Sequence, residues 1–227
     1  MRWSMLLGPM RLPSRQCWRR SPWRSDHDSK SSCWYANESG EMRIETNRLV
    51  LREFRPEDWE DIAAYWALPV HQRYYADVPD RDEFVRELVT MFVGTQAEEP
   101  RRRWHMAVTL RGDDRLIGNC NLRVNNPELG EANIGYELHS AQWGKGYATE
   151  AARAIVGFGF RDLGLHRIWA ECVLDNVGSQ RVLAKLGMQR EAHFREHQWY
   201  KGRWWDTLIY AMLDREWEPH DDFVVVR

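Results

Sequence analysis

The sequence predicts an α/β (α+β) fold in which strands and helices are intermixed along one main domain. Apolar residues recur at every second position in several short runs and at spacings of three and four residues in others. Turn-forming glycine, proline and asparagine residues separate these runs. The 227 residues, 43% of them hydrophobic, are enough to form one sizeable core.

The N-terminal half of this domain begins with a strand and two helices. Residues 43–54 alternate apolar and polar side chains, which is typical of a strand. A helix opens at Pro56, where acids occupy the first turn, and a second helix opens at Pro79. Three further strands are predicted, at residues 104–110, 116–124 and 131–139.

The C-terminal half contains two helices and three strands. A helix over residues 148–161 follows from an apolar stripe of alanine, isoleucine, valine and phenylalanine. Residues 166–174 predict a strand, and residues 176–186 predict a helix that Gly187 ends. Two last strands, 190–199 and 203–213, flank a hairpin turn. The predicted order is therefore β-α-α-β-β-β-α-β-α-β-β.

Composition excludes several classes of function. The formal net charge of −2 gives no reason to expect a nucleic-acid or membrane-surface partner. No run approaches the ~18 apolar residues of a membrane-spanning helix. The four cysteines form no close pair, so we expect neither a metal site nor a disulfide framework. We therefore expect a cytoplasmic protein.

The first 41 residues differ from the rest of the chain. They are rich in arginine, serine and tryptophan, contain three prolines and show no sustained hydrophobic period. We predict that residues 1–41 are a disordered extension; an organelle transit peptide is the alternative. The sequence then predicts a domain over residues 42–217, for which Met42 would be a natural start, and a C-terminal tail over residues 218–227.

A glycine-bearing turn joins the strand 131–139 to the helix 148–161. Gly144 and Gly146 allow positive φ angles and a close approach of a ligand to the backbone. The first turn of the helix leaves N–H groups unpaired, so the turn is suited to bind an anion such as a pyrophosphate. Thr149 interrupts the dinucleotide-binding fingerprint, and the P-loop pattern is absent. A plain connection without a ligand is the alternative.

The residues around this turn resemble a known family. Trp143-Gly144-Lys145-Gly146-Tyr147-Ala148-Thr149-Glu150-Ala151 resembles the acetyl-coenzyme A loop of the GNAT acyltransferase superfamily, in particular its RimJ/RimL-like branch of ribosomal-protein N-terminal acetyltransferases. The run Asp175-Asn176-Val177-Gly178-Ser179 is the second point of resemblance. Together they imply a GNAT fold over residues 42–217: a mixed, mostly antiparallel twisted sheet flanked by helices, with splayed central strands.

The resemblance also implies a cosubstrate and a set of binding residues. The cosubstrate would be acetyl-coenzyme A (acetyl-CoA). The residues implied in its binding are Tyr136, Leu138, Trp143, Gly144, Lys145, Gly146, Tyr147, Ala148, Thr149 and Asn176.

Three catalytic roles follow from the same resemblance and from the needs of acetyl transfer. The backbone N–H of Leu138 would stabilise the oxyanion. Ser179 would protonate the departing thiolate, with Tyr210 as a distant alternative. Glu137 is the first candidate for the general base, and Glu196 is the alternative.

The sequence therefore predicts an N-acetyltransferase in which a primary amine attacks acetyl-CoA directly in a ternary complex. The acceptor favoured by the resemblance is a protein N-terminal α-amine, ribosomal or other. A small amine (an amino acid, polyamine or antibiotic) and a non-catalytic CoA-binding module remain alternatives. The protein is expected to be a monomer or a homodimer.

Overall fold

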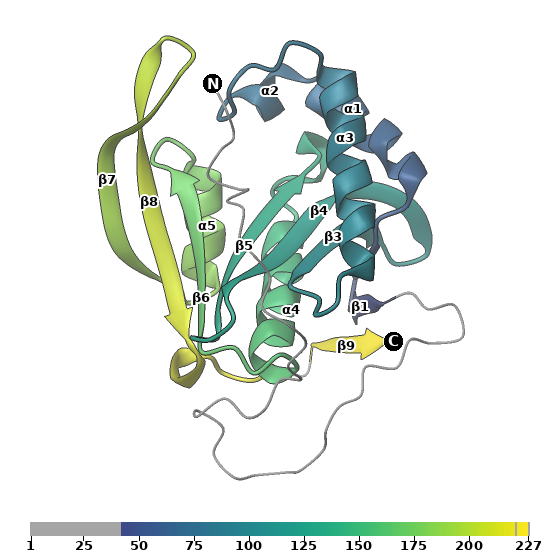
Figure 1. Cartoon of the computed structure of the whole chain (residues 1–227), viewed down its shortest axis with the longest axis vertical. Coiled ribbons are helices and arrows are strands. Elements are labelled where there is room, and N and C mark those ends of the chain that lie inside the picture. Colours follow the sequence, from purple (N-terminus) through teal and green to yellow (C-terminus); the bar gives the residue numbers. More distant parts are fainter. Residues whose placement is uncertain (1–41, 221, 227) are drawn as a thin grey trace. The chain divides into compact units, whose positions relative to one another are not determined.

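The computed structural model describes residues 42–220 and 222–226, which form one mixed sheet flanked by helices (Figure 1). The strands are β1 (Arg43–Thr46), β2 (Leu49–Glu53), β3 (Arg103–Leu110), β4 (Asp113–Asn126), β5 (Glu131–Leu138), β6 (Arg167–Val173), β7 (Gln189–Tyr200), β8 (Arg203–Leu213) and β9 (Phe223–Val226). The α helices are α1 (Trp59–Trp66), α2 (Pro69–Gln72), α3 (Arg81–Gly94), α4 (Tyr147–Arg161) and α5 (Val177–Lys185).

The nine strands lie in the order β7-β8-β6-β5-β4-β3-β2-β1-β9. All neighbours are antiparallel except β5 and β6, which pair in parallel over Glu131–Asn133 and Arg167–Trp169 only. Beyond Asn133, β5 stays paired with β4 while β6 diverges from it. The mixed, mostly antiparallel sheet with splayed central strands is thus confirmed.

The prediction of one strand over residues 43–54 is wrong, because the chain reverses between β1 and β2. The Thr46 hydroxyl accepts a hydrogen bond from the N–H of Leu49 at 3.0 Å, which closes a tight turn. The sequence reading also missed α2, a single turn that begins at Pro69. Within the stretch expected to be a tail, β9 pairs with β1. Residues 1–41 lie outside the described residues.

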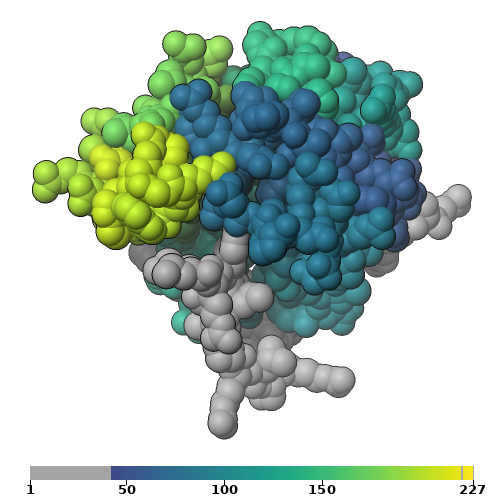
Figure 2. Space-filling view, turned by 90° about the horizontal axis from the view of Figure 1, so that it is seen from above, coloured from purple at the N-terminus to yellow at the C-terminus, as the bar shows by residue number. Residues whose placement is uncertain are grey.

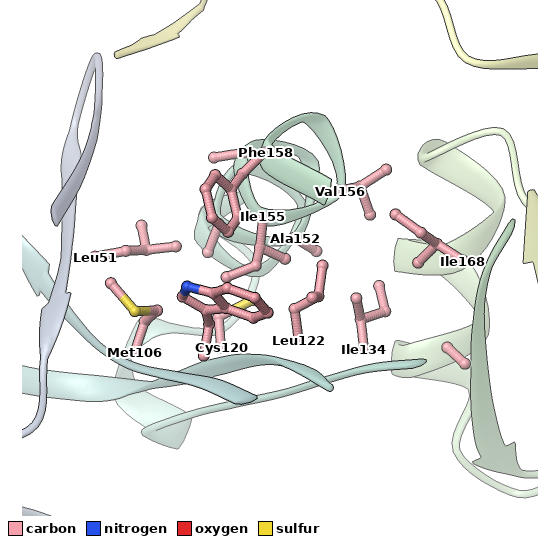
Figure 3. Packing of buried hydrophobic residues seen from close by; sticks show 14 of the residues in the cluster. Leu51, Met106, Cys120, Leu122, Ile134, Ala152, Ile155, Val156, Phe158 and Ile168 are labelled. Carbon is pink, nitrogen blue, oxygen red and sulfur yellow. The ribbon is translucent and has the colours of Figure 1, made fainter. Parts of the chain in front are cut away.

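One face of the sheet is covered by α4. Its apolar stripe packs against the central strands, and Figure 3 shows Ile155 and Phe158 pointing toward Met106 and Leu122. The helix approaches the sheet closely at Gly159, where an added Cβ would lie 2.7 Å from a methyl group of Ile168. This packing fixes the N-terminus of α4 relative to the end of β5.

The other face is covered by α1 and α3, which lie on the same side of the sheet (Figure 1). Their buried side chains, among them Ile62 and Val89, form a second apolar cluster. Unlike the first face, this one also buries polar side chains of the central strands, including His105 and Asn121. No helix in the described part of the chain is both long and apolar enough to cross a bilayer.

Candidate active site

The predicted glycine turn forms an exposed loop that ends on the first turn of α4. Gly144 and Gly146 have φ angles of 77° and 84°, a region that L side chains rarely adopt, and Gly146 is the N-cap of the helix. The N–H groups from Gly144 to Thr149 donate no hydrogen bond to any described residue. The loop therefore offers free N–H groups at a helix N-terminus, as an anion site requires.

Contacts from the β1–β2 turn hold this loop. The Arg48 guanidinium donates to the Lys145 carbonyl at 3.0 Å and pairs with Glu150 at 2.6 Å. The Thr46 hydroxyl also donates to Glu150, at 2.6 Å. Because the carbonyl and the N–H of a trans peptide unit point in opposite directions, the N–H of Gly146 points away from Arg48. The loop is thus preorganised by side chains that sequence reasoning did not assign to the site.

A pocket of about 420 Å³ opens beside the loop. It is lined by Gly146 and Thr149 and by three cations, Arg48, Arg153 and Lys185. The carboxylates Glu150 and Asp222 also line it and pair with Arg48 and Arg153, so that Lys185 is the cation of this lining without a carboxylate partner among the described residues. Positive side chains next to free N–H groups suit a ligand that carries several phosphates.

The backbone of β5 leads directly into this loop through the splayed part of the sheet. His139 donates its N–H to Ile117 on β4 at 2.8 Å, and backbone groups alternate in direction along a strand. The N–H of Leu138 therefore points toward the opposite edge, where no strand pairs with β5 beyond Asn133. The Leu138 carbonyl accepts the indole N–H of Trp143 at 2.7 Å, so that Trp143 anchors the start of the loop.

Ser179 lies across the same gap, on α5. Asn176 is the N-cap of this helix, and its side-chain oxygen accepts the N–H of Ser179 at 3.1 Å. The Ser179 hydroxyl lies 3.0 Å from the hydroxyl of Tyr136, which also donates to the Ser179 carbonyl at 3.1 Å. Burial raises the pKa of Tyr136, so its hydroxyl keeps its proton. Sequence reasoning assigned Tyr136 for its backbone and missed this contact of its side chain.

Glu137 points to the other face of the sheet, because side chains alternate along β5. One carboxylate oxygen accepts the indole N–H of Trp66 at 2.9 Å, and the other lies 3.4 Å from Nδ1 of His71. Nε2 of His71 accepts the N–H of Ser140 at 2.9 Å, which leaves the ring proton on Nδ1, facing Glu137. The Glu137 side chain is only 14% exposed. Its carboxylate is thus held in one orientation.

Aromatic side chains enclose the carboxylate, and they come from segments far apart in the sequence. Tyr75 packs on Trp66 with ring centroids 5.3 Å apart, and Glu137 together with burial raises the pKa of the Tyr75 hydroxyl. The hairpin of β7 and β8 reaches the same segment, since the Tyr200 hydroxyl donates to the Tyr74 carbonyl at 3.1 Å. Figure 2 shows this hairpin, in yellow, beside the blue segment that contains α2.

The structure places the two alternative residues differently: Glu196 lies away from Glu137, whereas Tyr210 lies near Tyr136, the partner of Ser179. Glu196 is exposed on the edge strand β7, which β8 and β6 separate from β5. Tyr210 is buried on β8, in the apolar cluster under α4. The contacts of Glu137 with Trp66 on α1 and His71 on α2 could not be predicted from the sequence. Nothing in the local pattern around either residue relates it to β5.

Comparison with known proteins agrees with this geometry. The sequence model of the acetyltransferase (GNAT) domain matches residues 48–189. The N-acetyltransferase YnaD of Bacillus subtilis (strain 168) is 36% identical over 178 residues, which cover 78% of this chain and 99% of that protein. The [ribosomal protein uS5]-alanine N-acetyltransferase of Escherichia coli (strain K12) is 24% identical over 82% of this chain and 97% of its own.

A solved structure extends the comparison to three dimensions. RimJ of Mycobacterium smegmatis, in complex with CoA-disulfide, superposes with a TM-score of 0.66 at 26% identity. The match covers 78% of this chain and 87% of that protein. The arrangement of strands and helices is therefore shared along most of the described chain.

Proposed function

This chain belongs to the GNAT acetyltransferase family, and on that premise we propose that it acetylates a protein N-terminal α-amine. It is an N-acetyltransferase that uses acetyl-CoA. In the proposed reaction the amine attacks the thioester directly, in a ternary complex of enzyme, acetyl-CoA and acceptor.

One observation carries the proposal: the gap between β5 and β6 is bordered by three kinds of functional group. The free N–H groups of the loop lie at one end of β5, and the Leu138 N–H faces the gap. Ser179 lies on one face of the sheet and Glu137 on the other. A thioester in this gap would have groups for binding, charge stabilisation and proton transfer around it.

In this mechanism each residue has one task. The N–H groups from Gly144 to Thr149, with the neighbouring cations, bind the diphosphate of the coenzyme. The Leu138 N–H donates to the thioester oxygen as negative charge develops there. Glu137 takes a proton from the attacking amine, and Ser179 gives a proton to the departing thiolate. The Tyr136 hydroxyl, 3.0 Å away, keeps its own proton and orients the Ser179 hydroxyl. Glu137 then releases its proton to solvent, and Ser179 takes one from solvent.

The choice of acceptor is supported by a relative and by the segments that lie near Glu137. The similar E. coli protein is named for the acetylation of an alanine of ribosomal protein uS5. In this chain, the contact of Tyr200 with Tyr74 joins two surface segments beside Glu137. We infer that a peptide terminus would lie against these segments with its amine toward Glu137.

Thiol release from acetyl-CoA with a panel of peptides and small amines tests the proposal. We expect turnover with peptides, and we expect Ser179→Ala and Glu137→Gln to lower kcat by about 10²- to 10⁴-fold each. CoA affinity, measured by calorimetry, should change little in both variants. If both variants keep wild-type turnover, the assigned roles are wrong; if only small amines react, the acceptor is wrong.

A further inference from the structure

Arg123 on β4 is a half-buried cation without a partner. No hydrogen bond or ion pair within 4 Å joins its side chain to another residue in the described part of the chain, and its Nε is shielded from solvent. The carboxylate that acts on its charge, Glu171 on β6, is exposed and makes no direct contact with it. Its neighbours on the same face are paired: Arg103 pairs with Glu98, and Arg101 with Glu53 at 2.5 Å. Because a buried charge without a direct partner is costly, an arginine with only a distant carboxylate nearby points to a ligand that is not part of the protein.

The surroundings of Arg123 share this lack of partners. Asn133, directly across on β5, has a buried side-chain oxygen without a hydrogen bond, and so does Asn121 on the same face of β4. Both ring nitrogens of His105, on β3, are also buried, and Asn121 is the polar side chain nearest to them. A side-chain amide can rotate to present either its oxygen or its N–H groups. Asn121 and Asn133 could therefore form further hydrogen bonds to a polar group that binds Arg123.

Arg123 lies next to the catalytic face of β5. A Cβ added at Gly135 would lie 3.2 Å from Nη2 of Arg123, so the guanidinium rests over the strand at this glycine. Glu137 follows two residues later on the same face, about 7 Å along the strand. Tyr75 is near both groups, because Glu137 and burial raise the pKa of its hydroxyl while Arg123 opposes them. Arg123 and Glu137 thus lie near each other on one face of β5, and both act on Tyr75.

We propose that Arg123 binds a carboxylate of the acceptor, about two residues from the amine that is acetylated. This inference rests on the proposed function, in which the amine is placed near Glu137. Consecutive Cα atoms are 3.8 Å apart, so a separation of about 7 Å corresponds to a two-residue segment. The guanidinium fork is suited to a carboxylate, with which it forms two parallel hydrogen bonds. Two sources share this chemistry: an acidic side chain at the second position of a peptide, and the terminal carboxylate of a dipeptide-sized amine.

Conjugates of CoA joined through an acetyl bridge to an acceptor amine test the proposal by calorimetry, without turnover. One matched pair carries Ser-Asp-Ala amide or Ser-Asn-Ala amide, and the other carries Ser-Ala as the free acid or as the amide. We expect the acid of at least one pair to bind about tenfold to hundredfold more tightly than its amide. A preference within the Ser-Asp-Ala pair would identify the carboxylate as an acidic side chain at the second position. A preference within the Ser-Ala pair would identify it as a terminal carboxylate.

Variants then assign this preference to Arg123. Arg123→Gln should remove the preference for the acid, whereas Arg103→Gln, the matched control on the neighbouring strand, should keep it. Gly135→Ala should reduce the preference without removing a charge, because the new Cβ displaces the guanidinium. If Arg123→Gln does not fold, the effect of Gly135→Ala on the preference for the acid shows whether the Arg123 guanidinium is responsible for it.

The proposal is overturned if the wild-type protein binds acid and amide equally in both pairs, or if Arg123→Gln keeps the preference. Loss of binding to CoA itself is a different result, since it would contradict the proposed function of the whole site. Binding of CoA combined with equal affinity for all four conjugates contradicts the role of Arg123 alone.

Discussion

The two sides of the β5–β6 gap are built in different ways. The side proposed to bind the coenzyme consists mainly of backbone groups from one continuous run, in which Gly144 and Gly146 shape the loop and α4 supplies its N-terminus. The acceptor side consists of side chains that come from α1, α2, β4, β5 and the β7–β8 hairpin. The first depends on local conformation, and the second depends on long-range packing.

This difference has a consequence for specificity. Backbone N–H groups are present whatever the side chains are, so the coenzyme side can stay the same while the sequence around it changes. Each polar contact on the acceptor side needs a particular side chain, such as His71 or Arg123. We therefore expect substitutions on the coenzyme side to affect one ligand, acetyl-CoA, and those on the acceptor side to affect the choice of amine.

The largest expected effect is at the glycine loop. Gly146→Val forces a β-branched residue into a left-handed conformation and turns the N–H groups away from the diphosphate. We expect the Kd for CoA, measured by calorimetry, to rise about hundredfold, which corresponds to the loss of one or two charge-assisted hydrogen bonds.

Gly112→Val is the matched control for this prediction. Gly112 has nearly the same φ angle, 85°, lies in the exposed turn between β3 and β4, and has open space around its Cα. The two variants should lose similar amounts of folding free energy, but only Gly146→Val should lose CoA affinity. Equal CoA affinity in both would mean that the loop N–H groups do not bind the coenzyme.

The second prediction concerns the acceptor-facing side of the sheet. Burial lowers the pKa of His105 to about 3, with the nearby charge of Arg123 adding to the effect, while the unfolded chain keeps a value near 6.5. Below pH 6.5 the unfolded state therefore binds a proton that the folded state does not. Stability falls as the pH drops from 6.5 toward 3, and between pH 7 and pH 5 this group alone removes about 2 kcal/mol.

His105→Leu should make this pH dependence weaker. The leucine fills the site, which is 1% exposed, without a titrating group. Urea unfolding at pH 7 and pH 5 measures the free energy in both proteins. We expect the loss between these pH values to be about 2 kcal/mol smaller in the variant, and an unchanged loss would mean that His105 is protonated in the folded protein.

The sequence allowed the local geometry of the proposed coenzyme side to be predicted, but not the contacts that form most of the proposed acceptor side. Gly146 and Ser179 stand in runs whose spacing has a local meaning, a turn before a helix and the first turn of another helix. His71 lies on a single-turn helix with no hydrophobic period, and its importance comes from two contacts with residues 66 and 69 positions away. Such contacts are set by the tertiary fold, which local patterns do not encode.

The same reasoning explains the errors in the fold. The turn between β1 and β2 was missed although the buried positions change phase across it, from Ile44 to Leu49 and Leu51. No glycine or proline marks the reversal, which a hydrogen bond to the Thr46 hydroxyl closes. The sheet order was available only through the resemblance, since no local pattern reports that β5 and β6 run in parallel and then diverge.

The third prediction tests whether the two sides are independent. His71 connects them, because Nε2 accepts from Ser140, just before the glycine loop, while Nδ1 faces Glu137. His71→Leu leaves the Ser140 N–H unpaired and frees one oxygen of Glu137. We expect kcat to fall about tenfold and the KM for acetyl-CoA to rise severalfold. If kcat falls while the KM for acetyl-CoA stays unchanged, the coenzyme and acceptor sides do not depend on each other through His71.

The smallest expected effect is at the bridge between the hairpin and the loop after α2. Tyr200→Phe removes the hydroxyl that donates to the Tyr74 carbonyl but keeps the ring that stacks on Trp205 at 4.9 Å. A neutral hydrogen bond contributes about 0.5–1.5 kcal/mol, so the KM for the acceptor should rise about threefold to tenfold. The Kd for CoA should not change, because this contact lies only on the acceptor side. Steady-state kinetics with a peptide acceptor measures the first quantity and calorimetry the second; a matching loss of CoA affinity would contradict the division between the two sides.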